Sequence, residues 1–176
     1  SVIAGGDQNR AAAQNCFSAG HRALADHAGS FVWADHTDAD FASTADQQFL
    51  VRAGGGVGIN TNAPSGFALN VAGAISCTNL TQTSDARFKT NVTGIENALG
   101  SILDLRGVTF EWDCGATDRN FPAGRQIGFI AQEVEEVLPE IVTTDSNGSK
   151  SVAYANVVPV LVEAVKAQAK AYEAQN

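Results

Sequence analysis

The sequence has no methionine and only three cysteines, Cys16, Cys77 and Cys114. These thiols share no CxxC or Cys/His ligand spacing, so we predict neither a disulfide framework nor a zinc site, and expect three buried or unreactive thiols. No run of about 18 apolar residues occurs, which excludes a membrane-spanning helix, and nothing at the N-terminus has the pattern of a signal peptide. Because the chain starts at Ser1 without a methionine, we expect a processed product or a piece of a longer polypeptide.

Positive charge is also scarce. Eleven Lys and Arg residues stand against 19 Asp and Glu residues, which gives a formal net charge of −8. Such a chain repels a phosphate backbone and an anionic bilayer, so we predict no nucleic-acid partner. The glycine-rich stretch 54–58 lacks the Lys-Ser/Thr end of a phosphate-binding loop, and no helical pattern follows it. We therefore predict no nucleotide and no other cofactor.

The composition divides the chain. Up to Thr83 there is no Lys and no Glu, and the only cations are Arg10, Arg22 and Arg52; every Lys and Glu lies from Ser84 onward. The stretch 76–83 is small, polar and unpatterned, which is typical of a linker. We therefore divide the chain into residues 1–53, 54–83 and 84–176.

The first segment repeats with a period of about 15 residues. Each unit is a short apolar run followed by turn residues, and a further run follows at 49–53 after a longer spacing. This period aligns Val2, Phe17 and Val32; Ala4, Ala19 and Ala34; Gly5 and Gly20; and His21 and His36. One strand and one turn cannot bury their own apolar face, so the units must stack on neighbours or on other chains. We predict an all-β repeat shaft, either a β-solenoid or a fibre.

Residues 54–83 are predicted to form a β neck and linker, because the glycine-rich run 54–59 is followed by 67–75, which alternates apolar and small residues at strand spacing. Together with the preceding repeats, this stretch resembles the β-structured shafts and heads of trimeric phage tail fibres and bacterial surface adhesins.

The last segment has the pattern of a small α+β domain. We predict a helix over 96–105 with Ile95, Leu99, Ile102 and Leu103 facing inward, strands at 108–112 and 126–130, and a helix over 131–138 that ends at Pro139. A hairpin is predicted from 141–144 and 150–154, which are joined by the turn-forming residues Asp145-Ser146-Asn147-Gly148.

A long helix is predicted at the C-terminus. Its apolar seam repeats at alternating spacings of three and four residues, as in a coiled coil, and consists of Val158, Leu161, Val165, Gln168 and Tyr172. With fewer than three heptads this helix would be marginal alone. The seam predicts association of several chains; the alternative is an amphipathic helix that packs on its own domain.

Four motifs in order carry a more specific resemblance. They are Ser84 to Val92 (SDARFKTNV), Gly128 to Val134 (GFIAQEV) with Leu138 to Glu140 (LPE), Val152 to Tyr154 (VAY) and Leu161 to Lys166 (LVEAVK). Residues 84–176 thereby resemble the intramolecular chaperone domain at the C-terminus of phage tail spikes, tail fibres and endosialidases, the S74 peptidase family. The resemblance implies a homotrimer on a virion or cell-surface fibre, whose receptor the sequence does not identify. In that family the domain helps three chains fold, and in many members its own Ser-Lys dyad then cuts it off.

The resemblance places the dyad at Ser84 and Lys89. A lysine serves as the base only as the neutral amine, which burial or nearby positive charge favours. Arg87 would favour the neutral amine of Lys89 if it lies close, whereas Asp85 would favour the charged form. The oxyanion donor that the reaction needs is Asn91 or a backbone N–H. Alternatively, Ser84 or Asp85 caps a turn and Lys89 is solvated.

Two further functions compete with a self-cleaving chaperone. One is an uncleaved adhesin or receptor-binding tip, in which the C-terminal domain is a permanent trimer cap. The other is a free serine protease, which is disfavoured because the sequence has no His-Asp pair in a suitable context.

Two polar clusters could resemble sites. His21, His27 and His36 lie near Asp26, Asp35, Asp38 and Asp40, but we interpret them as surface turn residues and predict no metal. Glu133, Glu135 and Glu136 suggest paired carboxylates, but adjacent residues on a helix do not share a face, so we expect a solvated acidic surface.

Overall fold

A computed structural model describes residues 1–113, 115 and 121–175, so Cys114 lies outside the described residues. The chain divides into two compact units, Ser1–Asn70 and Val71–Asn176. Among the described residues, no helix combines the length and the apolar character needed to cross a membrane. The division into residues 1–53, 54–83 and 84–176, which we inferred from composition, stays a prediction.

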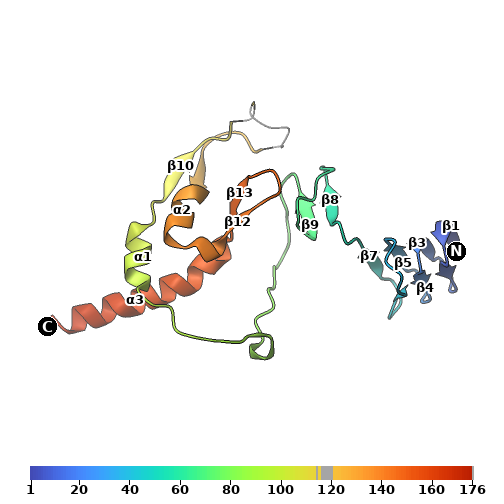
Figure 1. The fold of residues 1–176 in the computed structure, drawn as a ribbon, viewed down its shortest axis with the longest axis horizontal. Helices are drawn as coiled ribbons and strands as arrows, with labels where there is room; N and C mark the ends of the chain where they lie inside the picture. Colours follow the sequence, from blue (N-terminus) through green and yellow to red (C-terminus); the bar gives the residue numbers. More distant parts are fainter. Residues whose placement is uncertain (114, 116–120, 176) are drawn as a thin grey trace. The chain divides into compact units, whose positions relative to one another are not determined.

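The first unit is a parallel β-solenoid (Figure 1). Its larger sheet has the order β1 (Val2–Asp7), β3 (Phe17–His21), β5 (Phe31–Ala34) and β7 (Phe49–Arg52). A second sheet has the order β2 (Arg10–Ala11), β4 (Ala23–Ala25) and β6 (Phe41–Ala42). The stacked repeats are confirmed, but the prediction of one strand per repeat is wrong, because a second short strand follows β1, β3 and β5. The second strands are only two or three residues long, too short to show an alternating pattern.

The predicted repeat alignment is wrong by one residue in places. Phe17 pairs with Val2 and Phe31, and Phe31 pairs with Phe49. Val32 lies opposite Ser18, Ala34 pairs with Gly20 rather than Ala19, and Gly20 pairs with Gly6 rather than Gly5. His21 pairs with Asp7 on β1, and the register between β3 and β5 ends before His21 and His36. A bulge between Ile3 and Gly5 and unequal turns change the spacing. Such a slip matters because it moves each side chain to the other face of the sheet.

The solenoid core is thin and made of small residues, namely Cys16, Ala23, Ala25, Val32 and Ala34. Buried hydroxyls satisfy the backbone at the corners: Ser18 Oγ donates to the Ala23 carbonyl at 2.5 Å, and Ser43 Oγ accepts from the N–H of Asp26 and His27. The burial of Cys16 agrees with the prediction, whereas Cys77 is exposed.

After the solenoid strands in the sequence, β8 (Val57–Ile59) and β9 (Leu69–Val71) form a two-stranded sheet. The strand expected over 67–75 is therefore shorter. From residue 72 to residue 97 the only regular element is a 3-10 turn, η1 (Ala86–Phe88).

The second unit contains the predicted α+β elements. They are α1 (Ala98–Asp104), β10 (Val108–Phe110), β11 (Gln126–Gly128), α2 (Ala131–Val137), η2 (Pro139–Ile141), β12 (Val142–Thr144), β13 (Lys150–Val152), η3 (Tyr154–Asn156) and α3 (Val157–Glu173). β10 and β11 pair antiparallel, and so do β12 and β13, which confirms the hairpin.

Two small clusters form the core of this unit. Ala98 packs with Val160 and Ala164 where α1 lies along α3, and Val134, Ile141 and Val157 form the other cluster (Figure 1). Leu99 and Ile102 face inward as predicted, but Ile95 and Leu103 are exposed. Ile95 precedes the first turn of α1, and Leu103 lies about 100° around the helix from Ile102.

Candidate functional site

Ser84 and Lys89 lie on either side of the η1 turn. The side chain of Asp85 caps the turn by accepting from the N–H of Arg87 at 2.9 Å, and the N–H of Lys89 donates to the Ala86 carbonyl at 3.1 Å. Extended backbone at Lys89 then directs its side chain back toward Ser84, so that Lys89 Nζ donates to Ser84 Oγ at 2.8 Å. The structure thus brings the predicted nucleophile and base within hydrogen-bonding distance.

The two neighbouring charges pair with each other. Arg87 Nη2 lies 2.6 Å from Asp85 Oδ2. The hydrogen bonds from the Arg87 side chain and then its N–H lower the pKa of Asp85, and the same carboxylate raises the pKa of Arg87. Arg87 and Asp85 thus bind each other, and the expected effect of either charge on Lys89 stays a prediction. The capping alternative is also realised, but by Asp85 and not by Ser84.

Both members of the pair are exposed in the single chain. A general base must accept the serine proton, which only the neutral amine of Lys89 can do. Burial in a low-dielectric environment is what favours a neutral lysine amine at pH 7. The single chain therefore places the two groups within hydrogen-bonding distance but leaves them exposed.

Asn91, the candidate oxyanion donor, follows Lys89 on the exposed surface. Its φ of 54° lies in the left-handed region, which asparagine tolerates better than most residues. Its side chain makes no hydrogen bond to another residue that the structure describes. The oxyanion role therefore stays a prediction.

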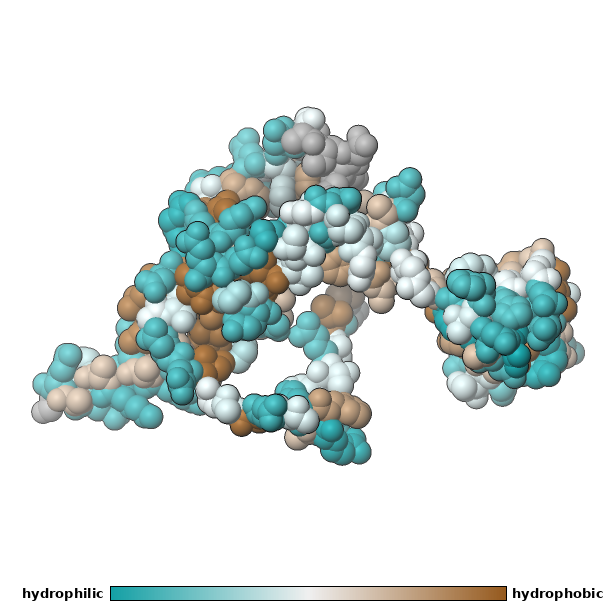
Figure 2. Space-filling view, viewed as in Figure 1, coloured by the Kyte–Doolittle hydropathy of each residue, from teal (hydrophilic) through white to brown (hydrophobic). Residues whose placement is uncertain are grey.

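The terminal helix α3 has two apolar faces. Val157, Val160 and Ala164 are buried against the rest of the unit. The predicted seam lies on a different face: Val158, Leu161, Val165 and Tyr172 are between 42% and 70% exposed, and Gln168 is exposed. Apolar residues come to the surface around the helices in Figure 2. Packing on its own domain explains the first face but leaves the seam open.

Comparison with known proteins bears directly on this region. The family model Peptidase S74, chaperone of endosialidase, matches residues 84–143. This segment, which contains Ser84 and Lys89, is therefore similar to that family. The recognition made from the four motifs is therefore confirmed, although the last two motifs lie beyond the matched residues.

The chain is also similar to phage proteins named long tail fiber protein Gp37. It is 35% identical over 85 residues to that of Salmonella phage S16, and 37% identical over 100 residues to those of Enterobacteria phages K3 and T2. These alignments cover 48%, 52% and 52% of this chain but only 11%, 8% and 7% of the relatives. The chain thus spans about a tenth of the length of the curated relatives it matches.

The carboxylates of helix α2 do not form a catalytic pair, because two of them pair with basic side chains. Glu133 accepts hydrogen bonds from Arg106, and Glu135 Oε1 lies 2.8 Å from Lys150 Nζ. Because each partner lies at a distance in the sequence, helix periodicity could not have found these ion pairs.

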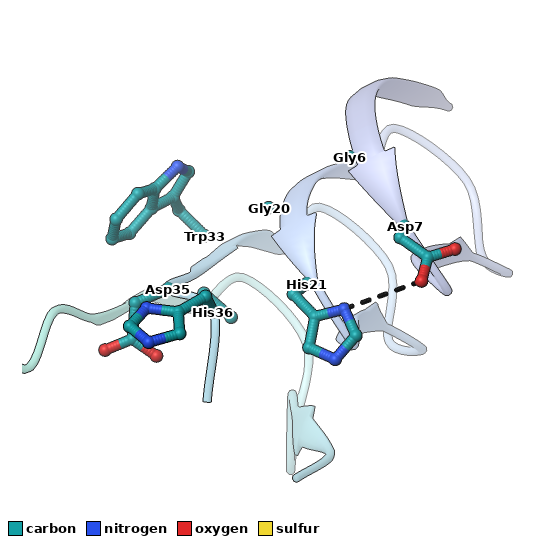
Figure 3. A pocket seen from close by; sticks show the side chains of 8 residues that line it. Gly6, Asp7, Gly20, His21, Trp33, Asp35 and His36 are labelled. Carbon is teal, nitrogen blue, oxygen red and sulfur yellow. Dashed lines mark ion pairs between the residues drawn. The ribbon is translucent and has the colours of Figure 1, made fainter. Parts of the chain in front are cut away.

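The histidines of the solenoid have separate surroundings. His21 lies 3.8 Å from Asp7 and 3.4 Å from Asp38, beside an open depression of about 550 Å³ that Trp33 and His36 also line (Figure 3). His27 Nδ1 instead lies 2.9 Å from Ser43 Oγ. In the described part of the chain, no three His, Cys, Asp or Glu side chains are grouped so as to hold a metal ion.

Proposed function

We propose that this chain is the C-terminal part of a phage tail-fibre protein, and that residues 84–176 act as an intramolecular chaperone that joins three copies. The match of residues 84–143 to the chaperone of endosialidase model carries this proposal. The relatives are long tail fibre proteins of phages, which supports a place in the virion tail fibre. The open seam of α3 is the surface through which the copies associate.

The solenoid explains why such a chaperone is useful. Its coils place similar apolar residues in similar positions, as Phe17, Phe31 and Phe49 show. A slip by one coil therefore changes few contacts, and the register between chains is weakly specified. Association through a separate C-terminal domain aligns the chains before the slow long-range pairing begins.

The seam can be tested by the mass of the assembled protein. We expect Leu161→Asp to place a charge at the contact of each chain and to convert the trimer into monomer or aggregate, measured by chromatography with light scattering. Glu163→Gln is the control, because Glu163 pairs with Lys166 outside the seam. A trimer that survives Leu161→Asp would exclude this helix as the contact.

The Ser84–Lys89 pair supports a second step, release of the domain by self-cleavage. In the assembled trimer the neutral amine of Lys89 accepts the Ser84 Oγ proton, and Oγ forms a bond to the carbonyl carbon of a peptide bond beside it. The amine of that peptide bond leaves with the proton from Lys89, and water hydrolyses the resulting ester. The 2.8 Å separation of Nζ and Oγ supports these roles. Loss of the domain would make the fibre kinetically stable, because the unit that guided folding is gone.

Gel electrophoresis and intact mass of freshly made protein test the cleavage. We expect two fragments that meet beside Ser84 in the native chain, and one intact band in Ser84→Ala and in Lys89→Ala. Lys166→Ala is a matched control that should cleave normally. If every form stays intact while the light-scattering mass is that of a trimer, cleavage is excluded and the chaperone role is retained.

One observation favours a second candidate, an uncleaved receptor-binding tip in which the C-terminal domain stays as a trimer cap. Ser84 and Lys89 are exposed, so the chain itself does not supply the burial that favours a neutral lysine amine. Deleting residues 84–176 distinguishes the two candidates. A chaperone predicts that the remaining chain becomes insoluble, whereas a well-folded truncated trimer favours the receptor-binding tip.

A further inference from the structure

A ladder of aromatic rings runs across the outer face of the larger solenoid sheet. Phe17, Phe31 and Phe49 occupy one row of the paired strands, and successive ring centroids are 4.6 Å apart with interplanar angles of 2° and 17°. Val2 continues the row on β1. The next residues along β3 and β5, Ser18 and Val32, are fully buried, so the ladder faces away from the core.

A second uncharged row lies beside the ladder. It consists of Gly5, Ala19, Trp33 and Val51, in register on the same four strands. Trp33 is exposed although its neighbours Val32 and Ala34 are fully buried. Phe49 is 73% exposed. Neither row contains a charged residue, so the two together form an apolar surface that this chain does not cover; we call it the aromatic face.

The other solenoid sheet has the opposite character. Its strands and turns display ion pairs, with Arg10 Nη2 2.6 Å from Asp26 Oδ2 and Arg22 Nη2 2.7 Å from Asp40 Oδ1. The whole chain carries a net charge of −8, so most surfaces of two copies repel each other. The aromatic face is a surface on which two copies meet without bringing like charges together.

The geometry of the ladder favours a flat protein surface over a small ligand. A sugar or a base stacks on the face of an aromatic ring. Within the ladder the ring faces cover each other, which leaves mainly the ring edges directed outward. A row of edges and methyl groups suits packing of one sheet against another, and contiguous exposed apolar patches of this kind mark interaction sites.

We propose that the aromatic face is the contact between the solenoids of neighbouring copies of this chain. This inference depends on the proposed assembly of several copies, but it concerns a surface separate from the α3 seam. The solenoids would therefore hold together through their own contact after the C-terminal domain has been released.

Photo-crosslinking of the full chain tests the proposal. Phe49→p-benzoylphenylalanine keeps an aromatic group in the ladder, and Ala42→p-benzoylphenylalanine places the same group at an exposed position of β6 in the charged sheet. After irradiation we expect covalent dimers and trimers from position 49, at least tenfold more than from position 42.

The outcomes separate this inference from the proposed function. A light-scattering mass of three chains without inter-chain products from position 49 would overturn the aromatic contact and leave the assembly intact. Equal inter-chain products from positions 49 and 42 would also overturn it. A mass of one chain would overturn the assembly and the aromatic contact together.

Discussion

Gly20 is the position where the solenoid is most sensitive to a single methyl group. Its φ is +100°, and a Cβ atom built there would lie 1.8 Å from the carbonyl oxygen of Ala34 on the next coil. Gly6 repeats this geometry one coil earlier, with a Cβ position 1.9 Å from the Gly20 carbonyl oxygen. The close approach follows from the parallel pairing of Gly6, Gly20 and Ala34. We therefore expect Gly20→Ala to force neighbouring coils apart.

The magnitude can be worked from these contacts. An alanine in a left-handed conformation costs about 1–2 kcal/mol. Separation of β3 from β5 weakens the hydrogen bonds between these two strands, each worth about 1 kcal/mol net. We expect a loss of about 3 kcal/mol in the free energy of unfolding, which lowers the Tm of a unit of this size by about 12–24 °C. Because each coil is stabilised by its interfaces with the adjacent coils, displacement of β3 also destabilises those coils.

Thermal unfolding followed by circular dichroism at one protein concentration measures this effect. Gly55→Ala is the matched control, because a Cβ there meets no atom within 4 Å and its φ is not positive. The control should stay within about 0.5 kcal/mol of the native chain. If Gly20→Ala melts like Gly55→Ala, the stacking of these coils is refuted.

Three further predictions concern the folded units. The N–H of Gly54, followed by the side chain and N–H of Thr37, holds the pKa of Asp35 far below its ordinary value, so the fold favours the ionised carboxylate. The stability that this carboxylate contributes is fully present above its unfolded pKa of about 3.8. It declines as the pH falls below that value. Melting of the solenoid from pH 7 to about pH 2 should show this decline, and a Tm unchanged at low pH would contradict it. Val134→Ala, at a fully buried site, should cost about 2 kcal/mol in urea unfolding of the C-terminal unit; a loss within error of zero would refute that core. Tyr154→Phe removes the hydroxyl that accepts the Phe129 N–H at 2.9 Å and should cost about 1 kcal/mol in the same assay, with no change expected if the bond is absent in solution.

The C-terminal elements could be predicted because their signals are local. Asp145 and Gly148 mark the turn of the hairpin, Pro139 follows α2, and the long periodic stretch 157–173 gives α3. Leu103 shows the limit of this reasoning. Its apolar character suggested burial, but the angular position around a short helix decides which of two adjacent residues faces the core.

The solenoid was harder to predict in detail because its register depends on contacts between coils. A constant period could not detect the bulge near Ile3, whereas the longer spacing before Phe49 was visible in the sequence. The second sheet was missed because β2 and β6 have only two residues each. The aromatic ladder depends on that register, since Phe17 stacks on Phe31 and not on Val32.

At the candidate site, sequence supplied the Ser84–Lys89 pair through the family resemblance. It could not show that Arg87 pairs with Asp85. Both residues lie within a few positions of Lys89, and only the geometry of the η1 turn determines whether they contact each other or Lys89. The exposure of the pair was also beyond the sequence, because a motif does not specify what covers it.

The central claim is that three copies assemble through the C-terminal domain. Chromatography coupled to light scattering on the full chain carrying Ser84→Ala, at micromolar concentration, tests it most directly. The account predicts a single species with three times the mass of the 18.3 kDa chain. A folded species with the mass of one chain would contradict it.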